Sequence, residues 1–170
     1  MIIYLVGFMG SGKSTFGRRL AARGEWYFMD LDLVIEKSED RTIAEIFDQS
    51  GEEYFREVET TMLRNIAREE NVVLACGGGT PCYNDNMEYM NREGITVYLK
   101  YDHAILAHRL VNAKKVRPLV RGMGEEELLE YVRTKLAERE EWYMKAQLII
   151  DGLRADPGKL KDIIVNLHAK

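Results

Sequence analysis

One stretch, IIYLVGFMGSGKST (residues 2–15), decides the fold of this chain. Its first five residues are apolar and mostly β-branched, which is typical of a buried strand of a parallel sheet. Gly7, four further residues and then Gly12-Lys13-Ser14 have the spacing of a phosphate-binding loop. A helix expected over residues 13–23 would point its positive end at the same anion. The stretch therefore predicts a nucleotide site, with a plain glycine-rich turn as the alternative.

The chemistry expected of this loop follows from its residue types. Glycines at positions 7, 10 and 12 leave backbone N–H groups able to curl around an anion without a Cβ in the way. Lys13 has the reach to meet the β- and γ-phosphates, and Ser14 can offer its hydroxyl to Mg²⁺. We therefore expect a nucleoside triphosphate and Mg²⁺ as ligands.

Length and charge limit the classes to which this chain can belong. It has 170 residues, which predicts a single domain over residues 1–170 with a substantial core. Its formal net charge of −4 argues against a general nucleic-acid surface. The opening apolar run lacks a basic leader and no run reaches membrane-spanning length, so we expect a cytoplasmic protein. Two cysteines, Cys76 and Cys82, are too few for a disulfide framework.

Strand candidates alternate with helical patterns along the chain. The strands are expected at residues 2–6, 26–29, 72–75, 95–99 and 147–150. A capping box at Thr42 to Glu45 should open a short helix, which Gly51 should break before a longer helix over residues 52–69. The alternation predicts an α/β fold of three layers, a five-stranded parallel sheet with helices on both faces. Ligands of such sheets lie at the carboxyl ends of the strands, so the chemistry is expected there.

The second strand is expected to end in Met29-Asp30-Leu31-Asp32. On an extended backbone the two carboxylates, at i and i+2, face the same side. One can help to hold Mg²⁺ through its waters, and Asp30 is the better candidate. The other can orient an attacking hydroxyl or accept its proton. The alternative is an Asp-rich cap for the next helix, which Asp32 could also provide.

The third strand ends in CGGGTP, residues 76–81. Three successive glycines after a strand indicate close approach of a ligand to bare backbone. A loose turn before the proline is the alternative. Cys76 itself falls in the apolar strand pattern, and we expect it to be a packing residue.

Arginines recur near the predicted crevice, at Arg56, Arg117 and Arg139. An arginine fork can bind a carboxylate bidentately, which suits an acidic substrate. The alternative for each is a surface salt bridge on a helix, and the sequence offers three partners: Glu52, Glu59 and Glu138.

Together these motifs resemble the shikimate kinase family, small P-loop kinases of aromatic amino-acid biosynthesis. The resemblance covers almost the whole chain and rests on GFMGSGKST, DLD, IAEIFDQSGEEYFREVE, GGG, VRPLV and REEWY. It implies the nucleoside-monophosphate-kinase-like fold and ATP-dependent, Mg²⁺-requiring phosphorylation of the 3-hydroxyl of shikimate. The basic segment NAKKVRPLVRGMG, about residues 112–124, is expected to be a mobile lid, with a solvated basic loop as the alternative. We expect a monomer.

The resemblance implies a role for each matching residue. Nucleotide contacts are implied for Gly10, Ser11, Gly12, Lys13, Ser14, Thr15, Arg109, Arg117 and Arg154. Metal contacts are implied for Ser14 and Asp30. Substrate contacts are implied for Asp32, Arg56, Gly78, Gly79 and Arg139, the arginine pair gripping the carboxylate. Lys13, Asp32 and Arg117 are the implied catalytic residues, with Asp32 as the base.

Two positions depart from the family pattern, and rival functions stay open. The family often has a basic residue close to Ala155, where this chain reads LRADP, and Cys76 stands where threonine is common. Among kinases the rivals act on another small hydroxy acid, such as gluconate, or on a nucleoside monophosphate. A nucleotide-binding switch is the rival from another class. The string NAKK does not match the guanine-reading Asn-Lys-x-Asp of a GTPase.

Overall fold

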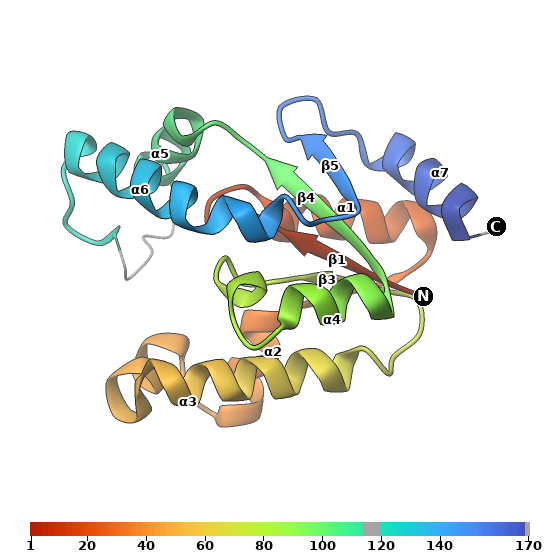
Figure 1. The fold of residues 1–170 in the computed structure, drawn as a ribbon, viewed down its shortest axis with the longest axis horizontal. Helices are drawn as coiled ribbons and strands as arrows, with labels where there is room; N and C mark the ends of the chain where they lie inside the picture. The colour runs from red at the N-terminus through yellow and green to blue at the C-terminus, as the bar shows by residue number, and fades with distance from the viewer. Residues whose placement is uncertain (114–119, 169–170) are drawn as a thin grey trace.

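The computed structural model describes residues 1–113 and 120–168, whose arrangement is shown in Figure 1. Five strands form one sheet in the order β2-β3-β1-β4-β5, and every pairing is parallel. The strands are β1 (Ile2–Val6), β2 (Tyr27–Asp30), β3 (Val72–Ala75), β4 (Ile95–Lys100) and β5 (Leu148–Asp151). The predicted sheet is confirmed, with β2 and β5 each displaced by one residue toward the C-terminus.

Helices connect the strands in the expected alternation. They are α1 (Lys13–Gly24), α2 (Leu31–Glu39), α3 (Ile43–Ile66), α4 (Asn86–Glu93), α5 (His103–Val111), α6 (Glu125–Tyr143) and α7 (Pro157–His168), with a 3-10 turn η1 (Thr80–Cys82). Thr42 and Glu45 form the predicted capping box at the start of α3. Gly51 interrupts α3 with φ 82° and ψ 171°, which confirms the predicted break. The helix ends at Ile66 rather than at residue 69.

Apolar layers cover both faces of the sheet. The residues of β1 alternate between them, with Tyr4 and Val6 in the larger cluster and Ile3 and Leu5 in the smaller. The smaller cluster lies under α1 and α7, which pack against each other (Figure 1). Helices α2 to α6 contribute to the larger cluster. Because both faces of the inner strands β1 and β3 are buried, these two strands are apolar throughout rather than alternating. The three predicted layers are confirmed.

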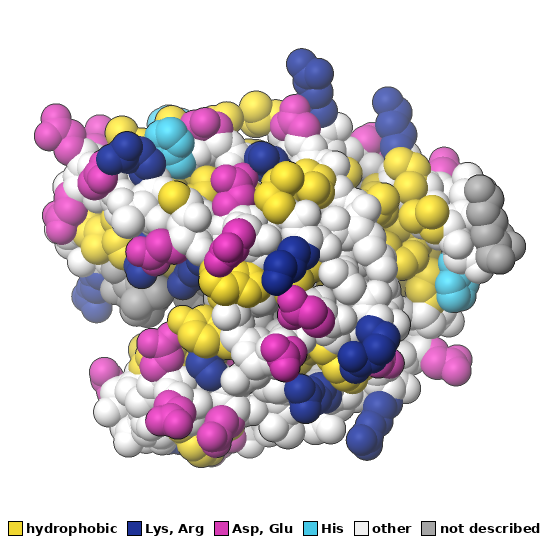
Figure 2. Space-filling view, viewed as in Figure 1, with side chains coloured by type: hydrophobic (Ala, Val, Ile, Leu, Met, Phe, Trp, Pro, Cys, Tyr) yellow, Lys and Arg dark blue, Asp and Glu magenta, His cyan; other side chains and the backbone are white. Residues whose placement is uncertain are grey.

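The surface mixes charges of both signs. On the face shown in Figure 2, acidic and basic side chains are interspersed with apolar ones rather than gathered into a basic stripe. Over residues 1–113 and 120–168, the structure has no helix with the length and apolar character that crossing a membrane requires.

Candidate active site

The phosphate-binding loop between β1 and α1 has the backbone that its glycines predict. Gly10 and Gly12 have φ of 77° and 80°, a region that side chains with a Cβ rarely adopt. A Cβ at Gly12 would also lie 2.9 Å from Nη2 of Arg109. Gly12 is the N-cap of α1 and supplies no side-chain cap, so the first amides of the helix are left for another acceptor. An anion at this helix terminus would satisfy them.

Lys13 lies folded over this loop. Its side chain is buried, and Nζ donates to the carbonyl oxygens of Gly7 and Phe8 at 2.8 Å each and to Ser11 Oγ at 3.3 Å. The loop thus holds an ammonium group against its own carbonyls. A bound phosphate would have to replace these carbonyls as a partner of Nζ.

Ser14 and Asp30, the residues expected to serve the metal, lie in contact. Ser14 Oγ donates to Oδ2 of Asp30 at 2.5 Å, and Oδ1 of Asp30 accepts from the backbone N–H of Asp32 at 3.1 Å. Both oxygens suit Mg²⁺, which usually keeps several waters and takes few protein ligands. Within the described ranges, no group of three or more His, Cys, Asp or Glu side chains is placed to hold a metal ion. A cation here would therefore share its coordination with phosphate oxygens and water.

The backbone around Asp32 differs from the sequence prediction. We expected Asp30 and Asp32 to face the same side of an extended backbone, and this was wrong, because β2 ends at Asp30 and Asp32 lies in the first turn of α2. The cap of this helix is Asp30 rather than Asp32. The cause is the hydrogen bond from the Asp32 amide to the Asp30 carboxylate, which starts the helix directly after the strand.

The glycine stretch after β3 brings several of the predicted site residues together. A Cβ at Gly77 would lie 3.1 Å from Oδ1 of Asp32, and one at Gly78 would lie 3.3 Å from Nη1 of Arg139. A Cβ at Gly79 would lie 2.6 Å from Nη2 of Arg56, so a side chain there would require the guanidinium to shift. The close approach predicted at these glycines is thus made by side chains of the protein itself. They come from α2, α3 and α6, which are far apart in sequence.

Arg56 contacts two carboxylates and two aromatic rings, those of Phe55 and Tyr83. Its Nη1 donates to Glu59 Oε2 at 2.8 Å, and Nη2 lies 3.3 Å from Oε1 of Glu52. The guanidinium carbon also lies 4.1 Å from the ring centroid of Tyr83. The salt bridges that the sequence offered as an alternative role are therefore present. They orient a guanidinium that is only 11% exposed, rather than an arginine on an open surface.

Glu59 is a part of this site that sequence reasoning treated only as a surface partner. Its side chain is 1% exposed, and it accepts from Thr80 Oγ1 at 2.6 Å as well as from Arg56. The missed signal was its position: Phe55, Glu59 and Leu63 recur every four residues on one helical face, and all three are buried. A carboxylate on such a face must be paired, because burying a charge without a partner is costly.

Arg139 has a different environment from Arg56. Its guanidinium carbon lies 5.8 Å from the ring centroid of Phe8, at the start of the phosphate loop. Within residues 1–113 and 120–168, no carboxylate lies within 4.0 Å of it, since Glu138 pairs with Lys135 instead. One arginine of the predicted pair is thus already paired with acids, whereas the other has no acidic partner in the described part of the chain.

Three further predicted residues, Arg109, Arg154 and Arg117, differ in what the structure shows of them. Arg109 lies on the phosphate loop, with Nε donating to the Gly10 carbonyl at 2.8 Å. Arg154 has a side chain that is 90% exposed, with Nε 3.7 Å from Oδ2 of Asp151. Arg117 and residues 114–119 of the expected lid lie outside the described residues. Cys76 is buried as expected, and burial raises the pKa of its thiol.

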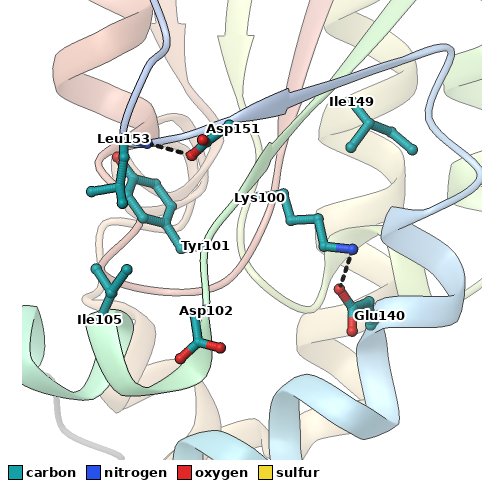
Figure 3. Close-up of a pocket in the computed structure, with 8 residues that line it drawn as sticks. All are labelled: Lys100, Tyr101, Asp102, Ile105, Glu140, Ile149, Asp151 and Leu153. Carbon is teal, nitrogen blue, oxygen red and sulfur yellow. Dashed lines mark hydrogen bonds and ion pairs between the residues drawn. The ribbon is translucent and has the colours of Figure 1, made fainter.

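A separate pocket of about 490 Å³ opens where β4 and β5 end (Figure 3). It is lined by Lys100, Tyr101, Asp102, Ile105, Glu140, Ile149, Asp151 and Leu153. Its single lining cation, Lys100, points to Glu140 at 3.2 Å. Arg109, which donates to the Gly10 carbonyl of the phosphate loop, lies over the ring of the lining residue Tyr101. The pocket therefore adjoins the candidate site without containing its residues.

Known proteins are similar to this chain in both sequence and fold. The family model described as shikimate kinase matches residues 9–166. Shikimate kinase of Parabacteroides distasonis is 44% identical over 149 residues, 88% of this chain and 86% of that protein. The crystal structure of shikimate kinase from Bacteroides thetaiotaomicron has a TM-score of 0.91 and 38% identity, covering 100% of this chain and 99% of that one. Shikimate kinase from Acinetobacter baumannii in complex with shikimate has a TM-score of 0.82 and 34% identity, covering 99% and 92%. The chain therefore belongs to the shikimate kinase family of P-loop kinases, the enzymes that phosphorylate shikimate with ATP.

Proposed function

We propose that this chain transfers the γ-phosphoryl group of ATP to the 3-hydroxyl of shikimate in the presence of Mg²⁺, giving shikimate 3-phosphate and ADP. The observation that carries this proposal is the convergence of Asp32, Arg56 and Arg139 on the glycines after β3. Shikimate carries one carboxylate and three hydroxyls, and this constellation offers two guanidinium groups and one carboxylate. The phosphate loop lies beside it, since Arg139 also contacts Phe8.

The nucleotide half of the site would work through the loop and α1. Residues 10–15 surround the phosphates, with Lys13 moving from the loop carbonyls to the β- and γ-phosphates. Arg109 is already fixed on Gly10 and adds positive charge at the same place. Ser14 and Asp30 would hold Mg²⁺ together with its waters, and the ion would neutralise charge on the β- and γ-phosphate oxygens. The contact between these two oxygens supports the assignment.

The substrate half would work through the arginines, the bare amides and Asp32. Arg56 and Arg139 bind the shikimate carboxylate from two helices. Within the described residues, the amides of Gly78 and Gly79 donate no hydrogen bond, which leaves both for the substrate. Asp32 lies at the other end of the glycine stretch and holds the 3-hydroxyl. As the hydroxyl oxygen forms its bond to the γ-phosphorus, its proton passes to Asp32 and the bond to the leaving ADP oxygen breaks.

The remaining assignments complete the proposal. Residues 1–170 act as one kinase domain and as a monomer, with residues 112–124 as the lid and Arg117 reaching the phosphates when the lid is closed. Closure would exclude water that could otherwise hydrolyse ATP. Arg154 is retained as a nucleotide contact. The reaction consumes ATP, so we place it in the cytoplasm.

A coupled assay of ADP release tests the proposal directly. Purified protein should turn over ATP with shikimate and Mg²⁺, and turnover should stop when EDTA removes the metal. Phosphorus NMR of the product should identify the 3-phosphate. Gluconate and a nucleoside monophosphate serve as control substrates in the same assay. Robust turnover of gluconate with none of shikimate would overturn the proposal.

A further inference from the structure

Tyr143, at the C-terminal end of α6, touches the candidate site from inside the core. Its side chain is 0% exposed, and its hydroxyl donates to the carbonyl oxygen of Gly78 at 2.5 Å. Arg139 lies four residues earlier on α6, one helical turn away. Its guanidinium packs over the Cα of Gly78 and also lies beside the Tyr143 phenol. One helix thus contacts the same glycine twice, at its carbonyl and at its Cα.

These two contacts fix the distance between the Arg139 guanidinium and the glycine backbone, and that distance matters for recognition of the substrate. The Arg139 guanidinium and the amides of Gly78 and Gly79 belong to segments far apart in sequence. Tyr143 joins these segments through a hydrogen bond whose donor side chain is fully buried. The carbonyls of Gly77 and Gly79 accept from the amides of Thr80 and Cys82 within the turn itself, whereas the Tyr143 hydroxyl ties the Gly78 carbonyl to α6. Glycines lose more conformational freedom on ordering than other residues, so we expect this tie to matter for the geometry of the turn.

We propose that Tyr143 is a positioning residue for shikimate, whose hydroxyl sets the distance between the Arg139 guanidinium and the backbone amides of Gly78 and Gly79. The inference rests on the proposed roles of Arg139 and these amides in binding the substrate. It assigns no contact between Tyr143 and the substrate itself. The effect of the hydroxyl should therefore fall on shikimate and spare ATP.

The neighbouring Tyr98 provides a matched control. It is 1% exposed, and its ring packs against that of Tyr143 with centroids 5.1 Å apart. Its hydroxyl reaches Oε1 of Glu140 at 3.5 Å, away from the glycine turn. The two tyrosines share residue type, burial and ring packing, and they differ in whether the hydroxyl holds Gly78.

The experiment compares Tyr143→Phe and Tyr98→Phe in the full-length enzyme. Steady-state kinetics would give kcat and the KM for each substrate, and thermal unfolding would give Tm. Tyr143→Phe should raise the KM for shikimate about three- to tenfold, the effect of one lost buried hydrogen bond. The KM for ATP and kcat should stay within about twofold. Tyr98→Phe should leave both KM values near wild type.

The outcomes separate positioning from simple core packing. Because Tyr143 is proposed to act through Arg139, the effects of Tyr143→Phe and Arg139→Lys on shikimate binding should be less than additive in the double variant. A lower Tm for Tyr143→Phe with an unchanged KM for shikimate would overturn the inference, as would equal increases in both KM values. Failure of Tyr143→Phe alone to fold would also overturn it, because the hydroxyl would then serve the whole fold. Wild-type turnover of shikimate, measured first, tests the proposed function separately.

Discussion

Replacing Glu59 by glutamine should weaken both the fold and the binding of shikimate. The carboxylate is 1% exposed and accepts from Arg56 Nη1 at 2.8 Å and from Thr80 Oγ1 at 2.6 Å. Glutamine keeps the volume and one acceptor oxygen but removes the negative charge beside a guanidinium that is 11% exposed. Arg56 would retain only Glu52, at 3.3 Å, as an acidic partner.

The magnitude follows from the burial of this pair. Breaking a buried ion pair by removing one partner typically costs about 3–5 kcal/mol. Glutamine can still hydrogen-bond Thr80, and Glu52 still faces Arg56, so we expect the lower value for a charged hydrogen bond, about 2 kcal/mol. For a chain of this length that corresponds to a decrease in Tm of about 4–8 °C. The KM for shikimate should rise about tenfold if most of the lost energy had held Arg56 in its binding position.

Glu52→Gln is the control for this prediction. Its side chain is 55% exposed and lies 3.3 Å from the same guanidinium. Exposed ion pairs contribute about 0–1 kcal/mol, so its Tm should change little. Differential scanning calorimetry and steady-state kinetics of both variants give the comparison. The reasoning would be refuted if Glu59→Gln kept the wild-type Tm and KM, or if Glu52→Gln were equally harmful.

Three further predictions concern the proposed catalytic and binding residues. Asp32→Asn should keep the fold, because Asp30 caps α2, and should lower kcat about 10²- to 10⁴-fold; near-normal kcat in steady-state assays would count against a role as base. Arg56→Lys and Arg139→Lys should each lower shikimate affinity roughly ten- to a hundredfold in isothermal titration, with little change for ATP. An equal loss for both ligands would contradict the assignment. Arg117→Ala should lower kcat at least about tenfold, and proteolysis within residues 112–124 of the wild type should slow only when shikimate and an ATP analogue are both bound. Unchanged kcat together with unchanged cleavage would leave only a solvated loop.

The sheet and the phosphate loop could be predicted because their causes are local. An apolar run of five residues, followed by glycines at fixed spacing, determines both the burial of β1 and the turn after it. Capping residues also act locally, as at Thr42 and at Asp156, whose Oδ1 accepts from the Lys159 amide at 2.9 Å. These interactions join residues within one turn, so the sequence contains all the information that they require.

The start of α2 was mispredicted although its causes are also local, because two local signals compete there. Two aspartates separated by one residue fit either a strand end or a helix cap. The choice depends on Leu31 between them, which is 0% exposed and belongs to the larger core cluster as the first residue of α2. Burial of that side chain and the cap from Asp30 favour the helix together. The sequence contained both signals but not their relative strength.

The interactions of Glu59 and Tyr143 could not be read from the sequence in the same way. Helical spacing places Glu59 on a buried face, but only the fold brings Thr80 to its carboxylate. Tyr143 reads as an ordinary core aromatic at the end of a helix. Its contact with Gly78 joins residues that lie 65 positions apart. Such contacts depend on how α6 crosses the end of β3, which no local pattern encodes.

The glycine stretch explains why residues from several elements form one site. Each glycine has a different neighbour where its side chain would be: Asp32 at Gly77, Arg139 at Gly78 and Arg56 at Gly79. Because these residues are glycines, the guanidinium groups of Arg56 and Arg139 can both approach the same short stretch of backbone. Two cations brought this close repel each other unless anions compensate them. Glu52 and Glu59 compensate Arg56, whereas Arg139 has no acid within 4.0 Å in the described residues. In the proposed function, the substrate carboxylate supplies the anion that Arg139 binds.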